Sequence, residues 1–149
     1  MMKKEKTMFV VNVEAAIYDD NQWLFIKRSE QEEHAAGQLA FAGGRVEAGA
    51  RANDVLEQTL HREVMEEVGV QVKNLQYVNS TLFFADNGTP VVDIVYVCEL
   101  ASGIPYEKSS EEVDAVLWLS TSDLLSTAEA PEFLKENVRQ ADSIRKKLG

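Results

Sequence analysis

A nine-residue segment near the middle of the chain constrains the fold and the chemistry more than any other feature. It runs from Arg62 to Val70 as Arg-Glu-Val-Met-Glu-Glu-Val-Gly-Val, so three glutamates and one arginine fall within about two helical turns. Gly69 stands where a left-handed glycine commonly ends a helix. Asp54–Glu57 has the D-x-x-E form of a capping box. The sequence therefore predicts a helix that begins near Asn53 or Asp54 and ends at Gly69.

The helical periodicity places the glutamates beside the apolar stripe of this helix rather than opposite it. Glu63 and Glu67 fall within about 60° of Leu60 when successive residues are spaced by about 100°. Carboxylates that crowd beside a core repel one another and are costly to desolvate unless a cation pairs with them. A solvated acidic face is the common alternative for such a pattern, but the inward placement counts against it. The stripe itself consists of Leu56, Leu60, Val64 and Val68.

One arginine cannot neutralise three glutamates, whereas a divalent cation can. Ligation by carboxylate oxygens suits Mg²⁺ or Mn²⁺, so the sequence predicts a metal site on this helix. Glu63 and Glu67 share a face and are the strongest candidate ligands, and Glu66 follows as a ligand or as a base that orients water. Gly43 and Gly44 let the backbone approach a ligand closely, so we expect them to form a flexible, phosphate-cradling loop opposite the metal site.

The segment from Arg62 to Val70 resembles the second half of the Nudix box, G-x5-E-x7-R-E-U-x-E-E-x-G-U with U aliphatic, at every fixed position. The first half departs from the family pattern. The spacing from Gly44 to Arg62 is four residues longer than usual, which fits a longer loop at residues 48–53. Asp54 stands where the family has its first glutamate, and Ala42 replaces the usual proline. Residues 43–70 are nevertheless identified as a Nudix box of the MutT-like hydrolases.

This resemblance implies a fold, a reaction and a cofactor. The fold is the Nudix α/β/α sandwich, with a mixed β-sheet between helices. The reaction is hydrolysis of a pyrophosphate bond in a nucleoside diphosphate linked to another moiety X, by water that a metal activates to attack phosphorus. Depending on the identity of X, the substrate would be a nucleotide sugar, a dinucleoside polyphosphate or a nucleoside triphosphate. Mg²⁺ or Mn²⁺ would be held by Glu63, Glu66, Glu67 and the carbonyl of Gly44, with Arg62 aligning a glutamate.

Three further residues are weaker candidates for the site. Arg28 ends a predicted strand, where a solvated position is the plain alternative, but in similar proteins a basic residue here often faces the substrate. Arg45 would touch phosphate or simply lie on the surface, and the sequence favours neither. The general base varies within the family and sometimes lies outside the box. Glu112, or its neighbour Glu111, would serve in that role, although exposed loop acids are the plainer interpretation of each.

The composition limits the classes of partner. The chain has 149 residues, of which 45% are hydrophobic and 27% charged, which is ordinary for one globular domain spanning residues 1–149. Its net charge of −10 disfavours nonspecific binding to nucleic acid polymers or anionic membranes. No signal peptide or membrane-spanning run is evident, so we expect a cytoplasmic protein. The single cysteine, Cys98, excludes an intrachain disulfide and is expected in the core. A homodimer is considered because similar proteins often form one, although no residue argues for it.

The remaining patterns predict strands before and after the box helix and a helix at the end of the chain. Expected specificity loops cover residues 29–37, 83–90 and 101–110, within which Phe83 and Phe84 are candidates for stacking on a base. Trp118 is expected in or near the core. The predicted strands are residues 8–18, 22–27, 38–41, 72–84, 91–100 and 115–119, of which 72–84 is expected as one or two strands with a break near Asn79. A short helical turn at 121–127 and a helix at 131–148 follow.

Two other classes of function remain open from the sequence. A non-catalytic nucleotide-binding module on the same fold would keep the architecture, but all three glutamates of the box are present. An acidic metal-binding or partner-binding domain without nucleotide chemistry is disfavoured by Gly43, Gly44 and Gly69.

Overall fold

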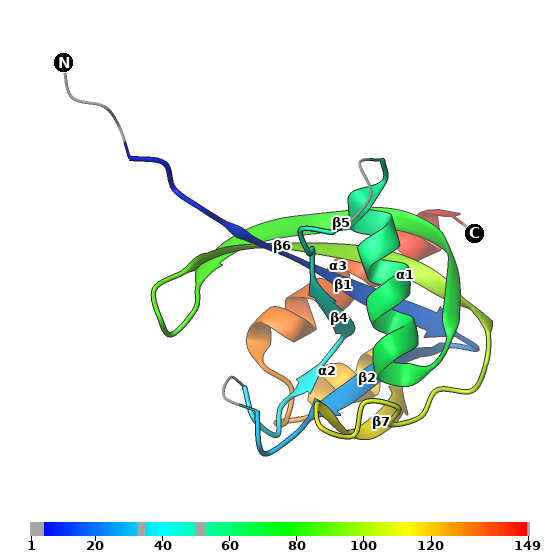
Figure 1. The fold of residues 1–149 in the computed structure, drawn as a ribbon. Helices are drawn as coiled ribbons and strands as arrows, with labels where there is room; N and C mark the ends of the chain where they lie inside the picture. Colours follow the sequence, from blue (N-terminus) through cyan, green and yellow to red (C-terminus); the bar gives the residue numbers. More distant parts are fainter. Residues whose placement is uncertain (1–4, 33–34, 50–52, 149) are drawn as a thin grey trace.

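The computed structural model describes residues 5–32, 35–49 and 53–148, which form one mixed β-sheet and three helices (Figure 1). The predicted elements occur in the predicted order with small changes of boundary, but the strand Ala42–Arg45 was not predicted. The elements are β1 (Val10–Asp19), β2 (Gln22–Arg28), β3 (Leu39–Ala40), β4 (Ala42–Arg45), α1 (Val55–Val68), β5 (Gln71–Phe84), β6 (Pro90–Ser102), β7 (Val113–Leu119), α2 (Thr121–Ser126) and α3 (Glu132–Leu148).

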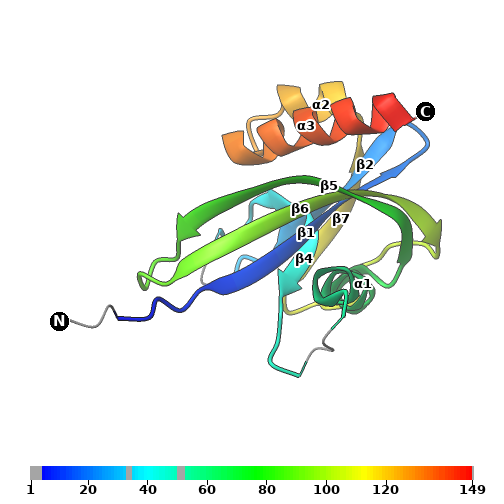
Figure 2. The same cartoon turned by 90° about the horizontal axis from the view of Figure 1, so that it is seen from above.

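The sheet lies between α1 on one face and α2 and α3 on the other, which confirms the expected α/β/α sandwich (Figure 2). Its main path runs β3-β2-β1-β6-β5, while β4 pairs with β1 and β7 pairs with β2. β1 and β6 run parallel from the Val10–Val91 pair to the Tyr18–Glu99 pair, and every other pairing in the described sheet is antiparallel.

Each face of the sheet has its own apolar core. Side chains alternate along a strand, so Val13, Ala15 and Ile17 of β1 face α1 while Ala16 faces α3. The predicted stripe of α1 packs on the first core, with Leu60, Val64 and Val68 fully buried and Leu56 partly buried; Trp118 packs there too. Trp23, Phe25, Leu134 and Val138 build the second core. Cys98 is buried as expected, and burial raises the pKa of its thiol to about 12.

The predicted capping box at the start of α1 is wrong, although its predicted end is confirmed. Asp54 is the N-cap residue, but its φ of 53° is left-handed and its side chain caps no backbone N–H. A capping side chain needs an extended backbone at this position, which the left-handed conformation does not provide. At the other end, Gly69 has a φ of 73° and donates its N–H to the Met65 carbonyl at 3.1 Å. Residues 50–52 of the preceding loop lie outside the described part.

Two predictions about the strands also need correction. Gly43 and Gly44 do not form a flexible loop but belong to β4, opposite Glu14 and Val13 of β1. A Cβ atom on Gly43 would overlap the Val13 carbonyl oxygen, so glycine is required for this close pairing of strands. β5 is one continuous strand, and its expected break near Asn79 is only a shift of register between Tyr77 and Asn79, as in a β-bulge.

Candidate functional site

The glutamates of α1 face the glycines of β4, so the two halves of the sequence motif meet in space. The Gly43 N–H donates to Oε1 of Glu67 at 2.7 Å, which ties the last turn of α1 to β4. Beside it, a Cβ atom on Gly44 would overlap the carboxyl group of Glu63. The glycine at position 44 therefore lets the Glu63 carboxylate lie directly against the backbone of β4.

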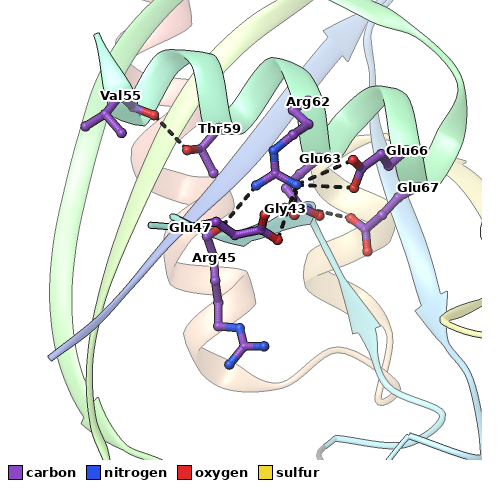
Figure 3. Close-up of polar contacts among 9 residues, drawn as sticks. All are labelled: Gly43, Arg45, Glu47, Val55, Thr59, Arg62, Glu63, Glu66 and Glu67. Carbon is purple, nitrogen blue, oxygen red and sulfur yellow. Dashed lines mark hydrogen bonds and ion pairs between the residues drawn. The ribbon is translucent and has the colours of Figure 1, made fainter. Parts of the chain in front are cut away.

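Arg62 is the centre of the polar contacts at this site (Figure 3). Its Nη1 donates to Oε1 of Glu63 at 2.9 Å and lies 3.3 Å from Oε2 of Glu66. Its Nη2 donates to the carbonyl oxygen of Arg45 at 3.1 Å. A longer ion pair of 3.8 Å joins it to Glu47, which the sequence did not suggest as a site residue. Arg62 thus holds the carboxylates of two candidate ligands and fastens α1 to the end of β4.

Burial distinguishes the three glutamates. Glu67 is 5% exposed, Glu63 has a side chain that is 14% exposed, and the side chain of Glu66 is 56% exposed. Desolvation raises the pKa of Glu67 to about 8, although the hydrogen bond from Gly43 opposes this shift. Desolvation also raises the pKa of Glu63, against the lowering effect of Arg62. The two buried carboxylates therefore lie where negative charge is costly, and an added cation would stabilise them.

The raised pKa of Glu67 predicts a pH-dependent stability. Because its pKa rises from 4.5 to about 8 on folding, the folded protein binds the proton more tightly than the unfolded chain. The stabilising contribution is fully present below pH 4.5 and is lost as the pH rises to about 8. We therefore expect the free energy of unfolding in chelating buffer to fall across this window, which urea denaturation at a series of pH values measures.

Glu67→Gln is the matched variant for this pH experiment. It removes one titrating group and should flatten the slope, while Glu14 and Glu63, whose pKa values are also raised, preserve part of it. A variant that keeps the full slope of the parent, or a parent whose stability rises with pH throughout this range, would contradict the assignment to Glu67.

The carboxylates at this site have the donor chemistry that suits a divalent cation, although their oxygens do not converge on a single point. Among residues 5–32, 35–49 and 53–148, no three histidine, cysteine, aspartate or glutamate side chains converge closely enough to hold a metal ion. Arg62 is bound to Glu63 and Glu66 instead. Carboxylate oxygens on a half-buried surface are nevertheless the ligands that Mg²⁺ and Mn²⁺ prefer. Burial raises the pKa values of Glu63 and Glu67, so a nearby cation would stabilise their charged forms.

Two of the three weaker candidates lie near these glutamates. Glu112 is one of the charges that raise the pKa values of Glu63 and Glu67, and Arg28 lowers the pKa of Glu67. The backbone places them together, because the Ser29 N–H donates to the Glu112 carbonyl oxygen at 2.9 Å. Arg45 is different: its guanidinium points away from the glutamates, and only its carbonyl takes part in the contacts (Figure 3).

A partly buried polar cluster beside the glycines was missed by the sequence interpretation. Glu14 lies opposite Gly43 on β1, and both burial and the carboxyl group of Asp93 raise its pKa well above the ordinary value. Asn12 donates its side-chain N–H to Asp93 at 2.7 Å. The available signal was the spacing of Asn12 and Glu14, because residues two positions apart on a strand point to the same face of the sheet. Their partner on β6 could not be identified without the parallel pairing of the strands.

Comparisons with known proteins identify the family to which the chain is similar. The profile of the NUDIX domain family matches residues 8–141. Two curated relatives are NAD-capped RNA hydrolases named NudC. The one from Photobacterium profundum is 32% identical over 96 residues, or 64% of this chain and 33% of the relative. The one from an Enterobacter species is 43% identical over 72 residues, or 40% of this chain and 26% of the relative. The chain thus spans about a third or less of these relatives.

Solved structures support the same assignment. The crystal structure of a MutT NUDIX hydrolase from Burkholderia pseudomallei aligns with a TM-score of 0.76 and 25% sequence identity, covering 89% of this chain and 98% of that chain. No helix in the described parts of the chain is both long and apolar enough to cross a membrane. The family match extends over most of the sequence and contains the facing glutamates and glycines. The chain therefore belongs to the NUDIX domain family, whose hydrolases cleave pyrophosphate bonds.

Proposed function

We propose that this protein hydrolyses a pyrophosphate bond in a nucleoside diphosphate linked to another moiety X, with Mg²⁺ or Mn²⁺ as cofactor. The observation that carries the proposal is the position of Glu63 and Glu67. Both carboxylates are largely buried against the glycines of β4, with raised pKa values. Two charged carboxylates in a buried place do little for stability, whereas they could bind a cation that in turn binds a diphosphate.

The cofactor would be held by the carboxylates of Glu63, Glu66 and Glu67 and by the carbonyl oxygen of Gly44. A bound divalent cation supplies charge shielding for the phosphate oxygens and lowers the pKa of water. Arg62 orients Glu63 and Glu66 through its guanidinium group, which fixes the directions of their oxygens.

The remaining roles fall to residues around this centre. Glu112 would accept the proton of the attacking water, since its charge already acts on both buried glutamates. Arg28 would bind a phosphate oxygen, because its charge already acts on Glu67. Arg45 remains a weaker candidate for phosphate, since its side chain would have to turn toward the glutamates.

Glu112→Gln tests the role of the base. Loss of the proton acceptor should lower kcat by about 10²-fold, with a smaller change in KM, because general-base catalysis acts on the chemical step. The acidic limb of the pH–rate profile should also change. Glu111→Gln is the matched comparison, since it removes the adjacent exposed carboxylate, which is the alternative base. A loss of kcat in Glu111→Gln alone would transfer the role to Glu111. Equal effects of the two variants would show that only the local charge matters.

The substrate is proposed only as a class. The relatives named as NAD-capped RNA hydrolases suggest that dinucleotides such as NAD should be assayed first. The net charge of −10 favours a small nucleotide over a nucleic acid polymer. We further infer that residues 1–149 act as one NUDIX domain in the cytoplasm, an inference consistent with the long family match and the single buried cysteine.

Phosphate-release turnover on a panel of substrates tests the whole proposal. The panel contains NAD, nucleoside diphosphate sugars, dinucleoside polyphosphates and nucleoside triphosphates, each with Mg²⁺ or Mn²⁺ and with a chelator. A phosphatase is added to release phosphate from the products. Hydrolysis of one class that the chelator abolishes would support the proposal and identify X. Metal binding without any turnover across the panel would favour the alternative, a non-catalytic nucleotide-binding module.

A further inference from the structure

The segment that joins β6 to β7, residues 103–112, lies across the C-terminal end of α1 (Figure 1). The last carbonyl groups of a helix have no partner within the helix and need other donors. In this protein the Tyr106 N–H donates to the Val68 carbonyl oxygen at 3.1 Å, and the Ser109 N–H donates to the Glu67 carbonyl oxygen at 3.3 Å. A distant part of the sequence, which we call the connecting segment, therefore caps α1.

The aromatic ring of Tyr106 packs on Gly69, the residue that ends α1. A Cβ atom on Gly69 would lie 2.6 Å from Cε1 of Tyr106, so a side chain at this position would displace the ring. Glycine is needed here both for its φ of 73° and for the room that it leaves. At Gly103, a Cβ atom would lie 3.1 Å from the Gly69 carbonyl oxygen. The connecting segment is thus held on α1 by a ring contact and by close backbone packing.

The connecting segment also holds Glu112. The Glu112 N–H donates to the Ser109 carbonyl oxygen at 3.0 Å, and the Ser109 N–H in turn donates to the carbonyl oxygen of Glu67. Two consecutive backbone hydrogen bonds therefore connect the proposed base to a proposed metal ligand. On its other side, the Glu112 carbonyl oxygen accepts the Ser29 N–H, and Val113 begins β7 as a buried residue. A shift of Glu112 relative to Glu67 requires at least one of these contacts to open.

Tyr106 contributes little to the apolar interior. Its side chain belongs to neither of the two cores of the described structure, and the residue is 51% exposed. Its ring contact is with the end of α1, beside the candidate site. Truncation of this side chain should therefore loosen the connecting segment locally and lower Tm by only a few degrees.

We propose that Tyr106 is a positioning residue, which keeps the Glu112 carboxylate at the distance from Glu67 that proton transfer requires. This inference rests on the proposed function, in which Glu112 accepts the proton of the attacking water. Tyr106 acts through the backbone of the connecting segment, because its ring holds that segment against Gly69. The effect on rate is expected to be large for so peripheral a contact, since misplacement of a catalytic group by about 1 Å can cost about 10²-fold.

Steady-state kinetics of Tyr106→Ala and Tyr106→Phe, each alone and combined with Glu112→Gln, test this role. Tyr106→Ala should lower kcat about tenfold and leave KM within about threefold of the parent, because the base is misplaced while substrate contacts remain. Tyr106→Phe should retain the kcat of the parent, since it keeps the ring. In the Glu112→Gln protein, Tyr106→Ala should lower kcat by less than about threefold, because the group that Tyr106 positions is already absent.

Ile104→Ala is the matched control for the kinetics. It removes an apolar side chain from the same connecting segment, but one that is 85% exposed. Its kcat should equal that of the parent. Thermal unfolding of all the variants checks that each remains folded.

Hydrogen exchange adds a measurement that needs no turnover. The amides of Lys108, Ser109 and Glu112 should exchange at least about tenfold faster in Tyr106→Ala than in the parent, while amides in the middle of α1 should be unchanged. Tyr106→Phe and Ile104→Ala should both exchange as the parent does.

The outcomes separate this inference from the proposed function. Unchanged exchange in Tyr106→Ala, or an equal loss of kcat with and without Glu112→Gln, would overturn the positioning role although the parent enzyme is active. A loss of kcat in Tyr106→Phe as large as that in Tyr106→Ala would do the same, because the hydroxyl group would then be what matters. A parent that hydrolyses nothing in the substrate panel would instead overturn the proposed function, and the positioning role with it, even where faster exchange showed that Tyr106 holds the segment.

Discussion

Glu63→Gln should lower kcat for the proposed metal-dependent hydrolysis by about 10³-fold while leaving the protein folded. Glutamine has nearly the same shape as glutamate, and its carbonyl oxygen can still accept a hydrogen bond from Arg62. The variant removes one negative charge from a position where the carboxyl group lies against Gly44 and is largely buried. Electrostatic stabilisation of the cation and of the diphosphate should therefore decrease, while packing should hardly change. Steady-state kinetics on the substrate class identified by the panel, together with thermal unfolding, measure the two effects separately.

Glu57→Gln is the matched control for this variant. It removes the same charge from the same helix, but at its first turn, where Glu57 interacts with Tyr96 rather than with the glutamate cluster. We expect kcat to stay within about threefold of the parent, since effects of distant charges are screened. Full turnover by the Glu63→Gln protein in the presence of Mg²⁺ would remove Glu63 from the set of metal ligands.

Alanine substitutions at the two adjacent glycines should affect different properties, mainly stability at Gly43 and mainly activity at Gly44. At Gly43, the added methyl group would overlap the Val13 carbonyl oxygen, which belongs to the backbone of β1 and cannot move aside. Gly43→Ala should therefore lower the free energy of unfolding by about 3 kcal/mol, which corresponds to a decrease in Tm of roughly 10 °C. At Gly44, the methyl group would overlap the Glu63 carboxyl group, which is the end of a flexible side chain. Gly44→Ala should displace that carboxylate, lower kcat by about 10²-fold and change Tm by only a few degrees.

Gly49→Ala is the control for this pair, because a Cβ atom at that position meets no atom within 4 Å. Thermal unfolding and kinetics of the three variants distinguish a strand contact from a site contact. If Gly44→Ala retained activity while binding metal as tightly as the parent, the close approach of Glu63 to β4 would have no catalytic role.

The features that the sequence predicted well were those carried by local periodicity. Leu60, Val64 and Val68 repeat at helical spacing, and they are fully buried on the α1 side of the sheet. Gly69 ends α1 as expected because the left-handed conformation at a helix end depends on the residue itself. The fold class followed from the order of such elements together with a motif that resembles one family.

The features that were missed depend on contacts between distant segments. Gly43 and Gly44 were expected in a loop because no local pattern reveals that β1 lies against them. The same limit applies to Glu14, whose altered pKa comes from burial and from Asp93, which is far away in the sequence. Asp54 has a capping pattern, yet its backbone is left-handed and its side chain caps no N–H group. In each case tertiary structure overrode a local preference.

The parallel pairing of β1 with β6 has a consequence for how the molecule acquires its structure. Nine consecutive residue pairs join strands that are about eighty positions apart, such as Asn12 with Asp93. Closing so long a loop costs chain entropy before the contacts compensate for it, and folding rates fall as such distant pairs become more important. During synthesis, the centre of the sheet cannot be completed until β6 has emerged. Until then the edge of β1 that pairs with β6 has no partner, and we expect chaperones and aggregation to compete with folding at this stage.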